Sequence, residues 1–127
     1  MRSFVRKPRR RGFTLVEVLT VVFIIEVLAA FALPSYINSV YSARQGTANS
    51  NAKSIAIAAQ GKAITANAYD TTLADYATDM GGTLPINPCT GTTTGYTITS
   101  TAITATVTAT AGTNCGSWSP TIYSLNL

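Results

Sequence analysis

The chain of 127 residues contains no histidine, one tryptophan and only two cysteines, Cys89 and Cys115. With so few of these side chains, we expect no zinc site, no cofactor and no Cys–His pair for nucleophilic catalysis. Charged residues make up only 11% of the chain, whereas hydrophobic residues make up 46%. This balance is unusual for a soluble protein, and most of the apolar excess lies near the N-terminus.

Positive charge is scarce outside the first twelve residues. Six of the nine lysines and arginines precede Gly12, so the remainder carries three basic and five acidic side chains, a charge of 3 − 5 = −2. The formal net charge of +4 therefore does not indicate a nucleic-acid-binding surface. Basic residues beside an apolar span hold that side in the cytoplasm, so we predict that the N-terminus stays inside and the C-terminus is exported.

Residues 13–33 form an apolar run of 21 residues, which is the length needed to cross a bilayer as a helix. Two carboxylates, Glu17 and Glu26, interrupt the run. An unpartnered acid within a membrane helix costs about 2.5 kcal/mol or more, so each carboxylate requires a specific role. An ordinary signal peptide is one alternative, because Ala30-Phe31-Ala32 fits an A-x-A cleavage site, but acids are atypical of such apolar regions. An ordinary membrane anchor is another.

Residues 34–67 continue a helical pattern, with small or apolar residues at gaps of three and four and polar residues on the opposite side. Pro34 separates the two halves, and we predict a kink there because proline removes a backbone hydrogen bond. A helix over residues 13–67 would be about 80 Å long at about 1.5 Å per residue. The first half is apolar all round and the second is amphipathic.

The rest of the chain changes from loop to strand character. Residues 69–95 contain prolines, glycines and three aspartates, which lack the spacing of an EF-hand, so we expect a structured loop without a metal site. Alternating apolar residues and threonines predict a hairpin over residues 96–110 and a third strand over residues 123–127. We expect the apolar face of this sheet to cover the helix, with an outer threonine face that is bare or carries O-linked sugar.

These patterns predict an α+β fold, in which a long N-terminal helix packs on a small antiparallel β-sheet head. Both cysteines lie in the exported part, where an oxidising compartment favours a Cys89–Cys115 disulfide. The predicted organisation is a basic leader at 1–12, a membrane or filament-core helix half at 13–33, an amphipathic half at 34–67 and a disulfide-bonded head at 68–127.

The segment from Arg9 to Glu17 resembles the prepilin processing site of type IV pilins, and Leu33-Pro34-Ser35-Tyr36 falls at the same spacing as in that family. The resemblance implies a structural filament subunit rather than an enzyme. A prepilin peptidase would remove the leader after Gly12, Phe13 would be N-methylated, and Glu17 would meet a terminal amine during assembly. The implied partners are other copies of the chain, the pilus assembly machinery and the inner membrane. The assembled filament would lie at the cell surface.

Three other functions compete with a major pilin. A type II secretion pseudopilin shares the N-terminal signature, although such heads more often rely on calcium in the loop than on a disulfide. A minor pilin and a membrane-anchored enzyme are the others, and no catalytic constellation supports the enzyme. The resemblance leaves twitching motility, adhesion and DNA uptake open, with nucleic acid contacted only through the assembled filament.

Glu26 departs from the family pattern, which usually has glycine or a small apolar residue at that place. The first basic residue after the cut is Arg44, about 27 Å further along a straight helix. We therefore expect Glu26 either to be protonated or to pair with Arg44 of a staggered neighbouring subunit.

Overall fold

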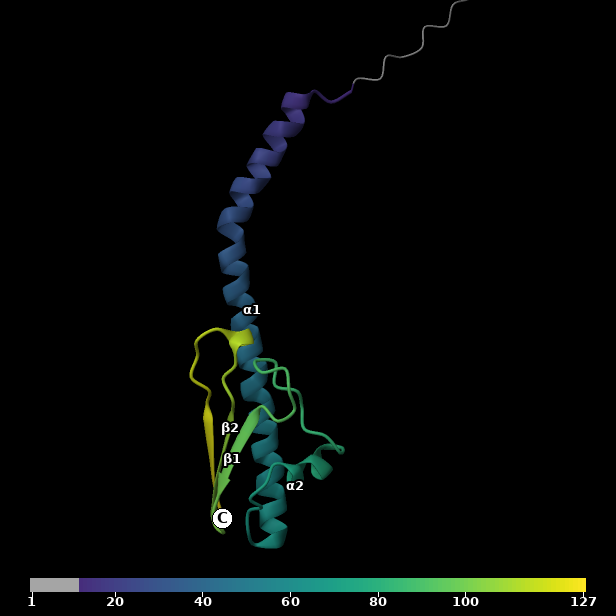
Figure 1. Ribbon diagram of the computed structural model, residues 1–127. Coiled ribbons are helices and arrows are strands. Elements are labelled where there is room, and N and C mark those ends of the chain that lie inside the picture. Colours follow the sequence, from purple (N-terminus) through teal and green to yellow (C-terminus); the bar gives the residue numbers. More distant parts are fainter. Residues whose placement is uncertain (1–11) are drawn as a thin grey trace, which may run out of the picture. The chain divides into compact units, whose positions relative to one another are not determined.

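The computed structural model describes residues 12–127, so residues 1–11 of the predicted leader (1–12) lie outside the described residues. The helical elements in chain order are α1 (Leu15–Ala66), α2 (Ala74–Ala77), η1 (Thr78–Met80) and η2 (Thr113–Cys115). The strands are β1 (Tyr96–Ser100), β2 (Thr104–Ala109) and β3 (Ile122–Asn126), and Figure 1 shows how these elements follow one another. The described chain divides into two compact units, one ending at Tyr36 and one comprising Ile37–Leu127.

The first unit is the apolar beginning of α1, which we call the stalk (residues 15–36). Its most apolar 18-residue window has a mean hydropathy of 2.5, and none of that window is buried. By length and composition, this helix can cross a membrane. The helix is uninterrupted at Pro34, and the predicted kink stays a prediction.

The second unit, which we call the head (residues 37–127), has a core of small residues. Ala48, Ala52, Ile55 and Ala59 on α1 are completely buried. Ala48, Ala52 and Ile55 form one cluster with buried residues outside α1, namely Tyr96, Val107, Ala109, Cys89 and Cys115. Alanine side chains allow the strands to approach the helix closely, and β-branched or aromatic residues then fill the remaining space.

The sheet is antiparallel, with strand order β1-β2-β3, as the alternating sequence pattern predicts. Tyr96 pairs with Ala109 in the β1–β2 ladder, and Ala105 pairs with Leu125 in the β2–β3 ladder. Because successive side chains point to opposite faces, the threonines share the outer face, where Thr99 lies opposite Thr106. The α+β fold of a long helix on a small antiparallel sheet is therefore confirmed.

The segment between helix and sheet contains two short helical elements that the sequence pattern did not reveal. These are α2 and η1, with four and three residues, which is too short for a helical period to be recognised. Tyr76 of α2 is completely buried, and its hydroxyl donates a hydrogen bond to the backbone carbonyl of Asp70. The expected structured loop is thus anchored by an aromatic side chain.

The end of this loop is joined to the segment after β2 by the Cys89–Cys115 disulfide. Next to it, the buried Asn87 side chain donates to the carbonyl oxygen of Thr110 at 3.0 Å and accepts from the Cys89 N–H at 2.8 Å. Gly112 passes so close that an added Cβ would lie 2.1 Å from the Cys89 carbonyl oxygen. A covalent bond and a buried amide network therefore fix the same part of the head.

Candidate processing and assembly site

The start of α1 is closed by a reciprocal pair of side chains, Thr14 and Glu17. The Thr14 hydroxyl oxygen accepts a hydrogen bond from the Glu17 N–H at 3.2 Å. In return, the Glu17 carboxylate accepts from the Thr14 N–H and from the Thr14 hydroxyl, each at 3.3 Å. This is a capping box, which satisfies backbone N–H groups that a helix start otherwise leaves unpaired.

The capping box places the Gly12–Phe13 peptide outside the helix. Helical structure begins at Leu15, and no atom lies within 4 Å of a Cβ built on Gly12. Phe13 is 85% exposed. A peptide bond in this position is accessible to a peptidase, whereas a bond within the helix would first have to be unwound. The sequence carries a local signal for this cap, namely a threonine three residues before a glutamate.

The two acids of the stalk differ in their local contacts. The Glu17 carboxylate is held by Thr14, whereas the Glu26 carboxylate has no hydrogen bond or ion pair among residues 12–127. Nine residues separate them, so at about 100° per residue they lie on opposite sides of an ideal helix. The two carboxylates therefore cannot both bind one terminal amine of a neighbouring subunit, and Glu26 requires a separate explanation.

Arg44, the expected partner of Glu26, belongs to the head. Its Nη1 donates to the carbonyl oxygen of Asn114 at 2.9 Å, which leaves the other guanidinium donors available. The pair between Glu26 and Arg44 of another subunit therefore stays a prediction. Among the predicted site residues, Gly12, Phe13 and Glu17 lie close together at the helix start, and Cys89 and Cys115 are joined in the head.

The aspartates of the loop are engaged in local structure. Asp70 forms a salt bridge of 2.7 Å with Lys62, and the Asp75 carboxylate accepts a hydrogen bond from the Thr72 hydroxyl. The hydrogen bond with Asp70 is the main reason why the pKa of Lys62 lies above its ordinary 10.5. In the described part of the chain, no group of three or more acidic, cysteine or histidine side chains is arranged to hold a metal ion.

Comparison with known proteins identifies the N-terminal segment. The prokaryotic N-terminal methylation motif matches residues 7–33. The type IV major pilin protein PilA of Myxococcus xanthus strain DK1622 is 34% identical over 95 residues, which are 75% of this chain and 40% of that pilin. Over that stretch, the chain is similar to a type IV major pilin. It spans 40% of the length of the pilin it matches, and no solved structure matches it significantly.

The methylation motif extends from before the capping box to the residue preceding Pro34. It therefore includes Gly12, Phe13, Glu17 and Glu26. The resemblance to type IV pilins that the sequence suggested is thus confirmed by two comparisons, one over residues 7–33 and one that reaches into the head.

Proposed function

We propose that this chain is a structural subunit of a type IV pilus filament, assembled by packing of its stalks. The observation that carries the proposal is the complete exposure of the apolar stalk within a chain whose head has its own buried core. Large side chains such as Leu19, Phe23 and Phe31 are 63%, 63% and 80% exposed, so their burial contributes little to the stability of the monomer. Their burial requires other molecules.

Lipid and neighbouring stalks are the two surroundings that can cover this surface. Each fully buried large apolar side chain contributes about 1.5–3 kcal/mol. The summed burial free energy of the stalk side chains therefore exceeds the folding free energy of a small domain, whether lipid or other stalks cover them. Helices that leave lipid and pack in a staggered array bury the same surface again. A heterologous contact of this kind repeats without closing, and a filament results.

Processing at Gly12 supplies the group that Glu17 needs in such an array. Cleavage by a prepilin peptidase would create a positive amine on Phe13, and a neighbouring Glu17 would accept a charge-assisted hydrogen bond from it. The contacts of Glu17 with Thr14 are long, at 3.3 Å, and exposed, so a charged amine competes well for the carboxylate. The precursor would lie in the inner membrane, and the filament would lie at the cell surface.

The head supports a pilin more than a type II secretion pseudopilin. Its loop is fixed by the Cys89–Cys115 disulfide, and the Asp70 and Asp75 side chains are engaged with Lys62 and Thr72. Calcium bound in this loop together with free thiols would favour the pseudopilin. The choice between a major and a minor subunit concerns abundance along the filament.

Imaging of filaments tests the proposed function. Cells from which this gene is deleted should lose pili, and a plasmid copy should restore them. An epitope inserted after Gly91, in a tight loop turn, should decorate the whole length of the filament if the subunit is major and scattered points or the tip if it is minor. Absence of the chain from sheared filaments would contradict both forms of the proposal.

A further inference from the structure

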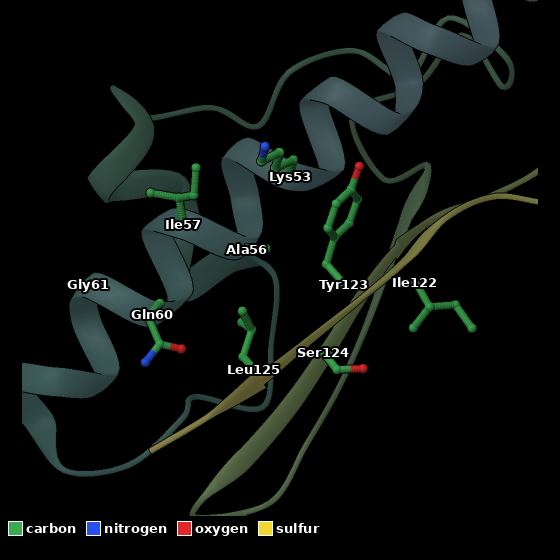
Figure 2. Close-up of a pocket in the computed structure, with 9 residues that line it drawn as sticks. All are labelled: Lys53, Ala56, Ile57, Gln60, Gly61, Ile122, Tyr123, Ser124 and Leu125. Carbon is green, nitrogen blue, oxygen red and sulfur yellow. The ribbon is translucent and has the colours of Figure 1, made fainter.

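A groove with a volume of about 570 Å³ runs along the head between the exposed side of α1 and strand β3. Figure 2 shows that Tyr123 and Leu125 point from β3 toward the helix. Lys53, Ile57 and Gln60 are among the α1 residues that line the hollow. Ile57 is 64% exposed, although it is a large apolar residue of the head. We call this hollow the β3 groove. Its walls are mainly apolar, and Lys53 supplies its positive charge.

The β3 groove is bordered by a free strand edge. The Leu127 N–H donates to the Ile103 carbonyl oxygen, so the alternation of an antiparallel ladder turns the backbone of residues 123 and 125 toward β2. The backbone groups of residues 122, 124 and 126 therefore point outward. Gln60 of α1 donates to the Asn126 carbonyl oxygen at 3.2 Å. The carbonyl oxygens of Ile122 and Ser124 have no partner among residues 12–127. Hydrogen-bonding groups thus remain open beside apolar side chains.

The charges of the head point to the occupant of the groove. The head contains Arg44, Lys53, Lys62, Asp70, Asp75 and Asp79. Four of these side chains have a hydrogen bond or salt bridge within the head. Within the described residues, Lys53 and Asp79 have neither, and both are exposed. One cation and one anion are therefore left over on the same unit.

Lys53 and Asp79 line two different hollows of the head. Asp79 lines a second hollow together with Ala58, Lys62 and Thr65, whereas Lys53 lines the β3 groove. Gly61 belongs to both hollows, and no atom lies within 4 Å of a Cβ built on it. Asp79 belongs to a cluster in which three aspartates surround Lys62, so the cluster has a charge of 1 − 3 = −2. The two hollows are thus complementary in charge.

We propose that the β3 groove receives the segment around Asp79 of a second copy of this chain, with the Asp79 carboxylate of that copy paired with Lys53. The contact deepens the proposed function and rests on it, because it adds a head-to-head interface to the packing of the stalks. Each copy offers one groove and one acidic segment on different surfaces. The contact is therefore heterologous, and it repeats from subunit to subunit without closing.

Zero-length carbodiimide cross-linking of purified filaments tests this contact directly, because the reagent joins only amines and carboxylates that touch. Proteolysis and mass spectrometry should find a Lys53–Asp79 peptide in the cross-linked dimer band and not in the monomer band. The Lys62–Asp70 bridge is an internal control and should be cross-linked in both bands. Failure to find the first peptide in dimers that contain the second would overturn the proposal.

Charge reversal provides a second test. Lys53→Asp and Asp79→Lys should each lower the yield of sheared filaments several-fold, and the double variant should restore it. Thr99→Asp, which adds a negative charge on the outer face of the sheet, is the matched control and should leave the yield unchanged. Single variants with normal yields would refute the contact while leaving the filament assignment intact. Absence of this chain from filaments of the parent strain would instead remove both the contact and the proposed function.

Discussion

The stalk and the head differ in whether their apolar side chains are buried within the chain. In the stalk, large side chains such as Phe23 and Ile25 are exposed, at 63% and 59%. In the head, the same helix buries mainly small ones, because five alanines and Ile55 are its buried residues. Small residues allow a sheet of the same chain to pack closely, whereas the large stalk side chains become buried only in contact with lipid or other subunits. Along this one helix, the surface buried within the chain is therefore formed mostly by small side chains, and the exposed stalk mostly by large ones.

The polar groups of the two regions differ in the same way. The head binds most of its charges internally, as in the salt bridge between Lys62 and Asp70. The stalk carries Glu17, which has only a local contact with Thr14, and Glu26, which has no partner in the described chain. Carboxylates that a chain cannot satisfy by itself indicate the surfaces at which it meets other molecules.

The largest effect is expected from the stalk. Glu17→Val should abolish filaments while leaving cleavage after Gly12 intact, because the terminal amine loses its partner in an apolar array. Thr14→Val is the matched control, since it removes the capping hydroxyl but keeps the carboxylate, at a cost of about 1 kcal/mol. Electron microscopy of sheared filaments and the mass of the membrane-bound subunit measure the two effects.

If Thr14→Val abolished filaments as completely as Glu17→Val, the carboxylate would act through the helix cap rather than through a neighbouring amine. Normal piliation in Glu17→Val would contradict both roles.

A smaller effect is expected from the head. Replacement of Cys89 and Cys115 by serine should lower the free energy of unfolding by about 3 kcal/mol, because the bond closes a loop of roughly 25 residues in the unfolded chain. Membrane insertion, which depends on the stalk, should not change. Denaturant unfolding of the full chain in detergent measures the first effect, and membrane fractionation measures the second. Free thiols at both positions in filaments taken directly from cells would contradict the disulfide.

Alkaline pH should weaken the head but not the stalk. Burial raises the pKa of the Tyr76 and Tyr96 phenols above their ordinary 10.0, and Asp70 raises that of Lys62 above 10.5. Groups with a raised folded pKa stabilise the head fully below their unfolded pKa, and this contribution is lost as pH rises through the folded values. Thermal unfolding of the full chain should therefore shift downward above about pH 10.

Tyr96→Phe should reduce the alkaline shift, whereas Tyr36→Phe in the stalk should not. An unfolding temperature that is the same at pH 8 and pH 11 would contradict this explanation.

The smallest effect concerns Glu26. If Glu26 pairs with Arg44 of a neighbouring subunit, Glu26→Gln should reduce filaments, and Arg44→Gln in the same chain should restore them by removing the unpaired cation. Arg44→Gln alone controls for loss of the hydrogen bond to Asn114. Filament counts by electron microscopy decide the outcome, and normal filaments from Glu26→Gln would show that the acid is protonated.

The regular elements were predictable because each repeats one pattern over many residues. The helix was expected over residues 13–67 and spans Leu15–Ala66, and the threonine alternation correctly predicted β1 and β2. The short α2 was not predictable, because four residues show no helical period. The Asn87 network was not predictable either, since its partners at Gly95 and Thr110 are brought together only by folding.

The candidate site divides in the same manner. Gly12, Phe13 and Glu17 were recognisable because they form one contiguous motif. The β3 groove was not recognisable, because Lys53 and Leu125 are distant in the sequence and meet only when β3 lies along α1.

The most direct test of the central claim is the intact mass of the subunit in purified filaments. If the stalks assemble the filament, the subunit should begin at Phe13 and carry one additional methyl group, and its head should contain the Cys89–Cys115 bond. A mass that corresponds to a chain starting at Leu33, after Ala30-Phe31-Ala32, would show that the stalk is a discarded signal peptide and would contradict assembly through it.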